Sequence, residues 1–168
     1  FNAAGSDLVY STYLGGSSSE SGGYGNLLLT AGGDVYVSGV TDSVDFPVTP
    51  EAYDTHSNGQ RDFWVAKLDT EGQLVAATYL GGKGYEAILS NTALDADGNI
   101  WCSGGTASDN FPTTRGAYCR RLGSIDFRDI FLAGLSSDLG ALNYSTVLGG
   151  GSVHETFVLA DPWSNSLY

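Results

Sequence analysis

The 168-residue sequence contains no methionine, only two cysteines and four prolines, and seven basic residues against nineteen acidic ones. Two cysteines are too few for a disulfide framework and lack the paired spacing of a zinc site. No apolar run reaches the ~18 residues that a membrane helix needs. The net charge of −12 disfavours nucleic acid and anionic membranes, which both need a basic surface. We therefore expect no nucleic-acid partner and no membrane insertion.

Glycine and aromatic residues are abundant instead. The sequence has 24 glycines, ten tyrosines and seven phenylalanines, whereas only 15% of its residues are charged. Glycine supplies tight turns, and aromatic residues are enriched in strands. The composition therefore favours an all-β protein, and the length allows one domain with a sizeable core.

One segment of nine residues occurs three times, at Leu8–Gly16, Leu74–Gly82 and Leu142–Gly150, and ends each time in Leu-Gly-Gly. The final leucine recurs after 66 and then 68 positions. Such a period indicates units that bury their apolar faces by stacking on one another. We predict units over residues 8–73, 74–141 and 142–168, of which the last is incomplete.

Each unit is predicted to hold four strands in a meander, beginning with the repeated segment. In the first unit the expected strands are 8–14, 26–30, 35–41 and 63–68, and residues 42–62 form a long connection. Turn residues separate the strands, and the strands are almost continuously apolar, which predicts cover on both faces of each sheet. Four-stranded units of this kind are typical of β-propeller blades. About two and a half units cannot close a ring, because propellers need at least ~4 blades.

Four motifs together resemble the SBBP family, the seven-bladed β-propeller repeat of bacterial and archaeal surface and secreted proteins. They are Tyr10–Gly16 (Tyr-Ser-Thr-Tyr-Leu-Gly-Gly), Asp45–Tyr53 (Asp-Phe-Pro-Val-Thr-Pro-Glu-Ala-Tyr), Asp62–Leu68 (Asp-Phe-Trp-Val-Ala-Lys-Leu) and Asp95–Gly104. The resemblance implies a propeller fold and an extracellular or cell-surface setting. It implies no catalytic residues.

An acidic residue follows each Gly-Gly pair at a similar distance: Glu20, Glu86 and Glu155. They are candidates for a carboxylate ring that attracts a hard cation such as calcium. The alternative is that each carboxylate accepts backbone N–H bonds within its own loop. His154 joins these binding candidates because it precedes Glu155 and has no counterpart in the other units.

Asp95–Asn99 resembles the start of a calcium loop, but position 106 is a threonine where that loop needs a glutamate. A hairpin turn is therefore predicted there, and no cofactor is expected unless calcium binds. Phe46, Phe111, Tyr53 and Tyr118 recur with the repeat and are predicted to fix the long connections to the sheets.

The two cysteines leave two alternatives open. Cys102 falls in an expected strand and Cys119 in the following connection, so one disulfide could close a short loop. The first unit has Val37 and Asp54 at the matching positions, so the repeat also folds without that bridge.

These observations favour a non-enzymatic extracellular propeller that acts as a structural, adhesive or protein-interaction scaffold. Its partners would be other protein chains or further blades of the same polypeptide, and a homopolymer or filament is one form of such an assembly. One alternative is a hydrolase or lyase acting on carbohydrate or peptide, with its site at the channel mouth or on other blades. Another is a cation-dependent, lectin-like binder.

Overall fold

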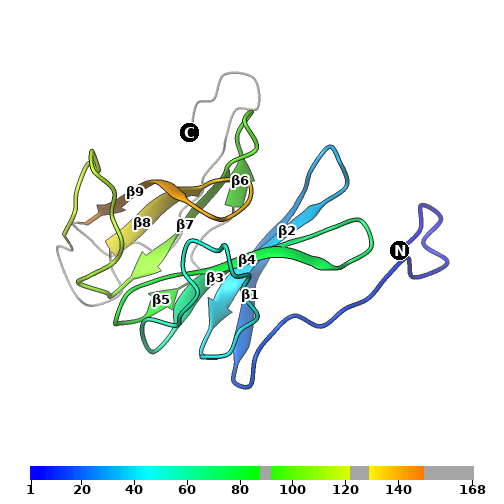
Figure 1. Cartoon of the computed structure of the whole chain (residues 1–168), viewed down its shortest axis with the longest axis horizontal. Helices are drawn as coiled ribbons and strands as arrows, with labels where there is room; N and C mark the ends of the chain where they lie inside the picture. The colour runs from blue at the N-terminus through cyan, green and yellow to red at the C-terminus, as the bar shows by residue number, and fades with distance from the viewer. Residues whose placement is uncertain (88–91, 122–128, 150–168) are drawn as a thin grey trace.

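The computed structural model describes residues 1–87, 92–121 and 129–149, which form two antiparallel β-sheets without a helix (Figure 1). The all-β prediction is therefore confirmed. The first sheet has four strands, hydrogen-bonded in chain order. They are β1 (Glu20–Leu29), β2 (Val35–Thr41), β3 (Asp62–Leu68) and β4 (Leu74–Leu80).

The second sheet repeats this order with one difference at its first position. Its strands are β5 (Glu86–Ala87), β6 (Thr92–Leu94), β7 (Ile100–Thr106), β8 (Asp129–Leu135) and β9 (Leu142–Leu148). Both β5 and β6 pair with β7, so together they occupy the place that β1 occupies beside β2. The register of β1 also shifts between Gly22 and Leu27.

Tight turns join β1 to β2 and β6 to β7, as predicted. Gly33 and Gly98 have φ angles of 91° and 79°, a region that glycine enters without a steric penalty. In the second turn the Asp95 N–H donates to the carbonyl of Asn99 at 3.1 Å. Asp95–Asn99 is thus a hairpin turn.

The repeated segment closes each sheet instead of opening it. β4 pairs with β3 and β9 with β8, so the second and third copies are the last strands of their sheets. The predicted strand at residues 8–14 is wrong, because this copy has no strand pairing. The second and third copies each pair with the strand that precedes them in the chain, whereas no described strand precedes residues 8–14. The strands of the first sheet therefore lie within residues 20–80 and those of the second within residues 86–148. Each sheet begins one strand after the start of the predicted unit and ends with the first strand of the next unit. Of the incomplete unit predicted over residues 142–168, the part from residue 150 onward lies outside the described residues.

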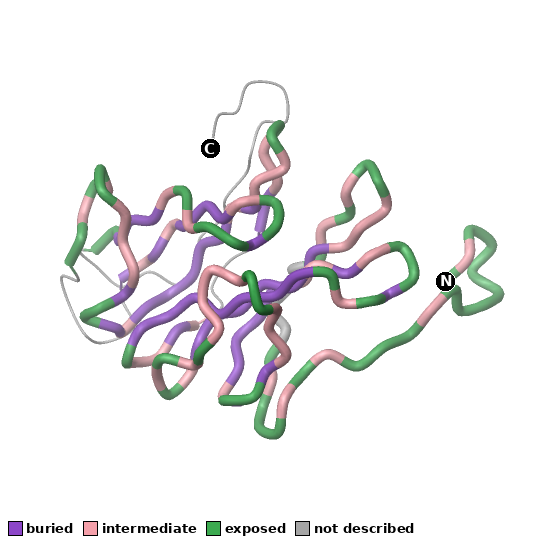
Figure 2. Tube along the Cα trace, viewed as in Figure 1, coloured by how far each residue is buried: buried purple, intermediate pink, exposed green. Residues whose placement is uncertain are grey.

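The main hydrophobic core lies between the two sheets, where the strands are most deeply buried (Figure 2). Phe63 of β3 and Phe131 of β8 are fully buried, with ring centroids 5.5 Å apart, and Phe111 stacks on Phe131 at 4.6 Å. Each such side chain contributes roughly 1.5–3 kcal/mol by leaving water. The first sheet adds Tyr36, Val40, Val65, Ala76 and Leu80, and the second Ile100, Cys102, Ala133, Leu135, Leu139 and Val147.

A second core cluster covers part of the other face of the first sheet, which we call the outer face. The Phe46 ring from the long connection lies 4.6 Å from the Trp64 ring and 6.0 Å from the Tyr79 ring. Leu14, from the first copy of the repeated segment, packs against this cluster. The connection is fixed further by the Tyr79 hydroxyl, which accepts from the Phe46 N–H at 2.9 Å.

Of the four repeating aromatic residues, three behave as predicted. Phe46 and Phe111 are buried, and Tyr53 is partly buried against the main core. The prediction is wrong for Tyr118, which is 83% exposed. The reason is that Tyr53 reaches the second sheet, where its N–H donates to the Leu139 carbonyl at 2.8 Å. No sheet among the described residues stands in that position for Tyr118.

The long connections run along the outer edges of β4 and β9. The Thr49 N–H donates to the Ala77 carbonyl, and the Tyr79 N–H donates to the Asp54 carbonyl, both at 3.1 Å. The second sheet repeats these bonds from Thr114 to Ser145 at 3.0 Å and from Val147 to Cys119 at 3.1 Å. An uncovered edge strand invites pairing with other chains, and here each sheet covers its last strand itself.

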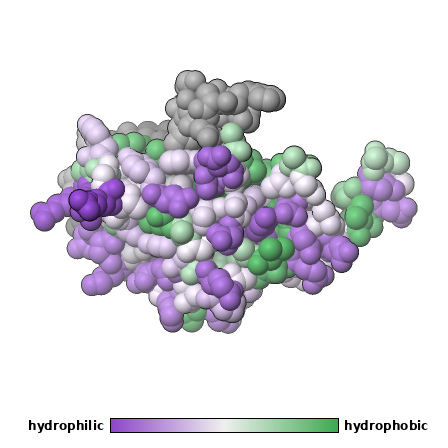
Figure 3. Space-filling model, turned by 45° about the horizontal axis from the view of Figure 1, so that its top comes forward, coloured by the Kyte–Doolittle hydropathy of each residue, from purple (hydrophilic) through white to green (hydrophobic). Residues whose placement is uncertain are grey.

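On the face of the molecule shown in Figure 3, hydrophilic residues predominate and hydrophobic ones form separate small areas. This distribution is consistent with the excess of acidic residues. In the part of the chain that the structure describes, no helix is long and apolar enough to span a membrane.

Candidate functional site

The two described acidic candidates occupy equivalent places, where a Gly-Gly loop leads into the first strand of a sheet. Glu20 is the first residue of β1 and is paired in register with Thr41. Glu86 is the first residue of β5 and is paired in register with Thr106. Paired residues of antiparallel strands project to the same face, so each carboxylate meets a threonine hydroxyl.

The Glu20 carboxylate holds the loop before β1 against the loop after β2. Its Oε1 atom accepts from the Gly16 N–H and from the Thr41 hydroxyl, both at 3.0 Å. The Ser43 hydroxyl donates to the same oxygen. Three donors from two segments thus converge on one carboxylate oxygen.

The Glu86 carboxyl has the same three kinds of donor. The Thr106 and Ser108 hydroxyls donate to Oε1 at 2.9 and 2.6 Å, and the Gly82 N–H donates to Oε2 at 3.4 Å. Both glutamates therefore have the contacts that the loop-fixing interpretation expects. The role in ligand binding stays a hypothesis.

The environments of the two carboxyls differ in spite of the matching donors. At Glu20, desolvation favours the neutral form, but the hydrogen bonds from Ser43, Gly16 and Thr41 together outweigh it and lower the pKa. Glu86 is fully buried, and this desolvation, helped by the nearby charge of Asp62, raises its pKa to about 7. Burial also raises the pKa of Asp62. The same repeat position thus holds an ionised group in one copy and a readily protonated one in the next.

Asp62 is the functional residue that the sequence analysis missed. It begins β3 and is fully buried, and its counterpart Asp129 begins β8 and is also buried. Recurrence of an aspartate at the start of both strands was a usable signal. The pairs Thr41/Ser43 and Thr106/Ser108, which donate to the glutamates, carry a similar signal in their shared Thr-x-Ser spacing.

The remaining candidates do not join this site. Glu155 and His154 lie outside the described residues. His56 is exposed, and its Nδ1 lies 2.9 Å from the Thr55 hydroxyl. Asp95 is used within its own turn, where it accepts from Asn99 and from the Trp101 indole N–H.

Cys102 and Cys119 are free thiols. Cys102 is fully buried in the main core, and burial raises the pKa of its thiol far above the usual range. Cys119 is partly buried against the same core and donates its S–H to the Arg121 carbonyl at 3.2 Å. Cys102 is therefore a packing residue rather than a reactive thiol.

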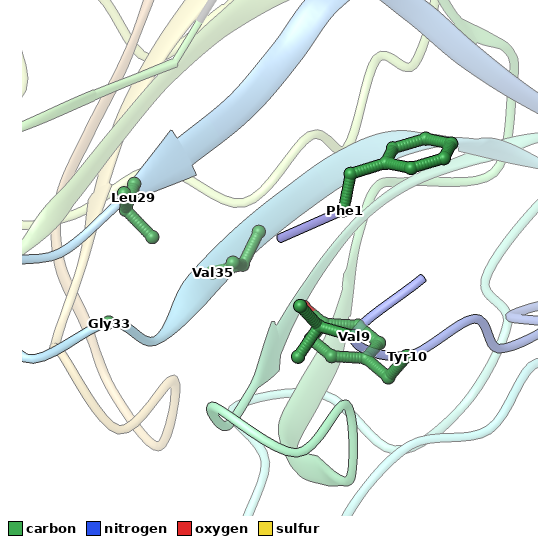
Figure 4. A pocket seen from close by; sticks show the side chains of 6 residues that line it. All are labelled: Phe1, Val9, Tyr10, Leu29, Gly33 and Val35. Atoms are coloured by element: carbon green, nitrogen blue, oxygen red, sulfur yellow. The ribbon is translucent and has the colours of Figure 1, made fainter. Parts of the chain in front are cut away.

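A cavity of about 460 Å³ opens between the N-terminal segment and the outer face of the first sheet (Figure 4). Its lining consists of Phe1, Val9, Tyr10, Leu29, Gly33 and Val35. In Figure 4, Val9 and Tyr10 lie on the N-terminal segment, whereas Leu29 and Val35 come from the adjoining ends of β1 and β2. Tyr10 is the one lining residue with a polar side chain, so the cavity has no cluster of polar side chains that would indicate a site for a polar substrate.

Within residues 1–87, 92–121 and 129–149, no group of three or more histidine, cysteine or acidic side chains is arranged to hold a metal. Glu20 and Glu86 accept hydrogen bonds from hydroxyl and N–H groups of adjoining strands and loops, so their evident action is to hold loops and adjacent strands together. Comparison of the sequence with family models finds no match, and comparison with curated proteins finds no relative.

Proposed function

We propose that this chain is a non-enzymatic scaffold module, whose outer face takes a further sheet of the same repeat. The sheets stack as the blades of a β-propeller do, in an extracellular or cell-surface protein. The observation that supports this proposal most directly is the uncovered apolar part of the outer face of the first sheet, at β1. Stacking of similar sheets would bury it, as the first sheet already buries the matching face of the second.

Equivalent residues of the two sheets show how much apolar surface is left uncovered. Leu27 pairs with Val37, as Thr92 pairs with Cys102, so Leu27 and Thr92 are equivalent. Leu27 is 61% exposed, whereas Thr92 is 5% exposed. A leucine exposed where its counterpart is buried indicates a face made for packing.

The next outward-facing position of β1 gives the same result. Leu29 corresponds to Leu94, since they pair with Val35 and Ile100, the first residues of β2 and β7. Leu29 is 68% exposed, but Leu94 packs against the core between the sheets.

The first copy of the repeated segment also indicates that a further sheet of the same repeat packs here. Its equivalents, β4 and β9, pair with β3 and β8 and complete their sheets. Among the described residues Leu8–Leu14 has no such partner, and Leu8, Val9 and Tyr13 are 61%, 64% and 103% exposed. A preceding sheet of the same repeat would supply a strand like β3 for it to pair with, by β-strand addition.

The contacts of the carboxylates favour a scaffold over an enzyme. A catalytic site is built once, whereas Glu20 and Glu86 make the same bonds in successive sheets. Among the described residues, no observation favours a hydrolase, a lyase or a cation-dependent lectin.

Self-association tests the proposal, because a second copy of the chain offers the same repeat. We expect sedimentation velocity to show concentration-dependent assembly, and micrographs to show rings or filaments, the two outcomes of a head-to-tail interface. The double variant Leu27→Asp/Leu29→Asp should remain monomeric. Val44→Asp is the matched control, because Val44 is 78% exposed but lies in the long connection.

Two results would contradict the proposal. One is a wild-type protein that stays monomeric up to about 1 mM, where even an interaction of ~4 kcal/mol would be detected. The other is assembly that the double variant leaves unchanged. If Val44→Asp abolished assembly as fully as the double variant does, added negative charge rather than loss of the outer face would be the cause. That result would also count against the proposal.

A further inference from the structure

Two fully buried carboxyl groups meet where the first sheet joins the second. Asp62 is the first residue of β3 and Glu86 the first of β5, and each is 0% exposed. Asp62 Oδ1 and Glu86 Oε2 both lie within 3.0 Å of the point where a Cβ on Gly81 would stand. The glycine leaves room for these two oxygens to face each other.

The hydrogen bonds of the pair leave one acceptor without a donor. Asp62 Oδ2 accepts from the Ser57 hydroxyl at 3.0 Å and from the N–H groups of Asn58 and Gly59 at 2.7 and 3.4 Å. Among the residues that the structure describes, no N–H or hydroxyl group donates to Asp62 Oδ1. A buried acceptor of this kind destabilises the folded chain if it stays unsatisfied.

Glu86 is able to satisfy this acceptor. Its Oε1 atom takes both hydroxyl donors, whereas Oε2 has one long bond of 3.4 Å from Gly82. Oε2 is also the oxygen that faces Asp62. We propose that Asp62 and Glu86 share one proton, which Glu86 Oε2 carries and donates to Asp62 Oδ1.

Among the described residues, no basic side chain forms an ion pair with either carboxyl. Arg61 is bound to Asp42, with Nε 2.7 Å from Oδ1, and its guanidinium lies 5.9 Å from the centre of the Tyr85 ring. Burial raises the pKa of Tyr79 of β4, and the nearby charge of Asp62 adds to that rise. Two ionised carboxylates would therefore repel each other in a buried site, and a shared proton removes that repulsion.

The proton makes the junction between the sheets sensitive to pH. In the folded state the pKa of Glu86 is raised from 4.5 to about 7, mainly by burial, and that of Asp62 is also raised. The folded chain then binds more protons than the unfolded chain between these values. Stability from this pair is full below pH 4.5 and is lost as the pH rises to about 7, and it stays lost above that.

Urea unfolding of the whole chain, repeated across pH 4.5 to 8, tests the shared proton. The wild-type unfolding constant should rise by up to about a hundredfold through release of one proton. In Glu86→Gln the amide donates to Asp62 at every pH, so this rise should disappear. Glu20→Gln is the matched control, because Glu20 has the same three kinds of donor but a lowered pKa. It should keep the rise.

Further measurements keep the test decisive if Glu86→Gln does not fold. Asp62→Asn should also remove the rise, since its amide donates to an ionised Glu86. At pH 6 the infrared spectrum of the folded wild type should show the carbonyl band of a protonated carboxylic acid. A wild type with neither the rise nor the band would overturn the proposal, as would a Glu86→Gln variant that keeps the rise. Both carboxyls belong to this chain, so failure of self-association would leave this result unaffected.

Discussion

Gly39 and Gly104 occupy equivalent positions in β2 and β7, and neither has room for a side chain. A Cβ on Gly39 would stand 2.6 Å from the Ser21 carbonyl oxygen and 2.6 Å from the Trp64 indole. At Gly104 it would stand 2.6 Å from the Ala87 carbonyl oxygen and 2.8 Å from the Phe131 ring. These glycines let the first strand and a large aromatic side chain approach the second strand closely.

Replacing either glycine by alanine should therefore destabilise the fold. We expect Gly39→Ala and Gly104→Ala each to lower the free energy of unfolding by about 1–3 kcal/mol, because backbone and ring must both move. Gly32→Ala is the control: its nearest neighbour is the Thr30 hydroxyl at 3.7 Å, so a change of about 0.5 kcal/mol or less is expected. Urea unfolding measures all three, and equal effects in the three variants would show that close packing is not the cause.

At the scale of single elements, the three copies of the repeated segment share a sequence but not a structure. β4 pairs with β3 on one side, and on the other the Tyr79 N–H donates to the Asp54 carbonyl. Leu8–Leu14 has neither kind of partner within the part of the chain that the structure describes. Strand propensity alone does not order a segment, because each backbone group must find a partner strand.

Hydrogen exchange should separate the copies in a dilute, monomeric sample. We expect amides of Ala77 and Tyr79 to be protected nearly as well as those of inner strands, although β4 lies at the end of its sheet. Amides of Tyr10 and Thr12 should exchange at rates close to those of an unstructured chain. Strong protection of Tyr10 in the monomer would contradict the structure, whereas protection that appears only on assembly would support strand addition.

The elements that the sequence predicted best were those with local signals. The strand at 35–41 was predicted with the bounds that the structure shows, because turn residues and a long connection border its apolar run. The turns at Gly33 and Gly98 followed from turn chemistry. The failures concern long-range pairing: residues 8–14 need a neighbour that only a sheet order reveals.

The candidate site shows the same division. Glu20 and Glu86 were found because they recur after Gly-Gly. The contact of Glu86 with Asp62 joins two sheets across 24 positions of the chain, and nothing local to either residue indicates it. The pKa of about 7 at Glu86 depends on that contact and on full burial, so it required the structure.

At the scale of the whole molecule, the acidic excess acts on stability and on assembly together. A net charge of −12 on 168 residues repels itself in the folded state and repels a second copy of the chain. Such repulsion between exposed charges is screened by salt, with a Debye length of about 30 Å at 0.01 M and about 8 Å at 0.15 M. Stacking of apolar outer faces should therefore become easier as ionic strength rises.

We expect sodium chloride to raise the melting temperature and strengthen self-association between about 0.01 and 0.15 M. Calcium chloride at equal ionic strength should add little beyond this general screening, because the described carboxylates Glu20 and Glu86 are held by donors of their own sheets. Differential scanning calorimetry compares the two salts at matched ionic strength. The Leu27→Asp/Leu29→Asp variant separates the effect of salt on stability from its effect on self-association. This variant should keep the rise in melting temperature and lose the association. A large rise specific to calcium and reversed by EDTA would contradict this prediction, and would favour the cation-dependent binder over the scaffold.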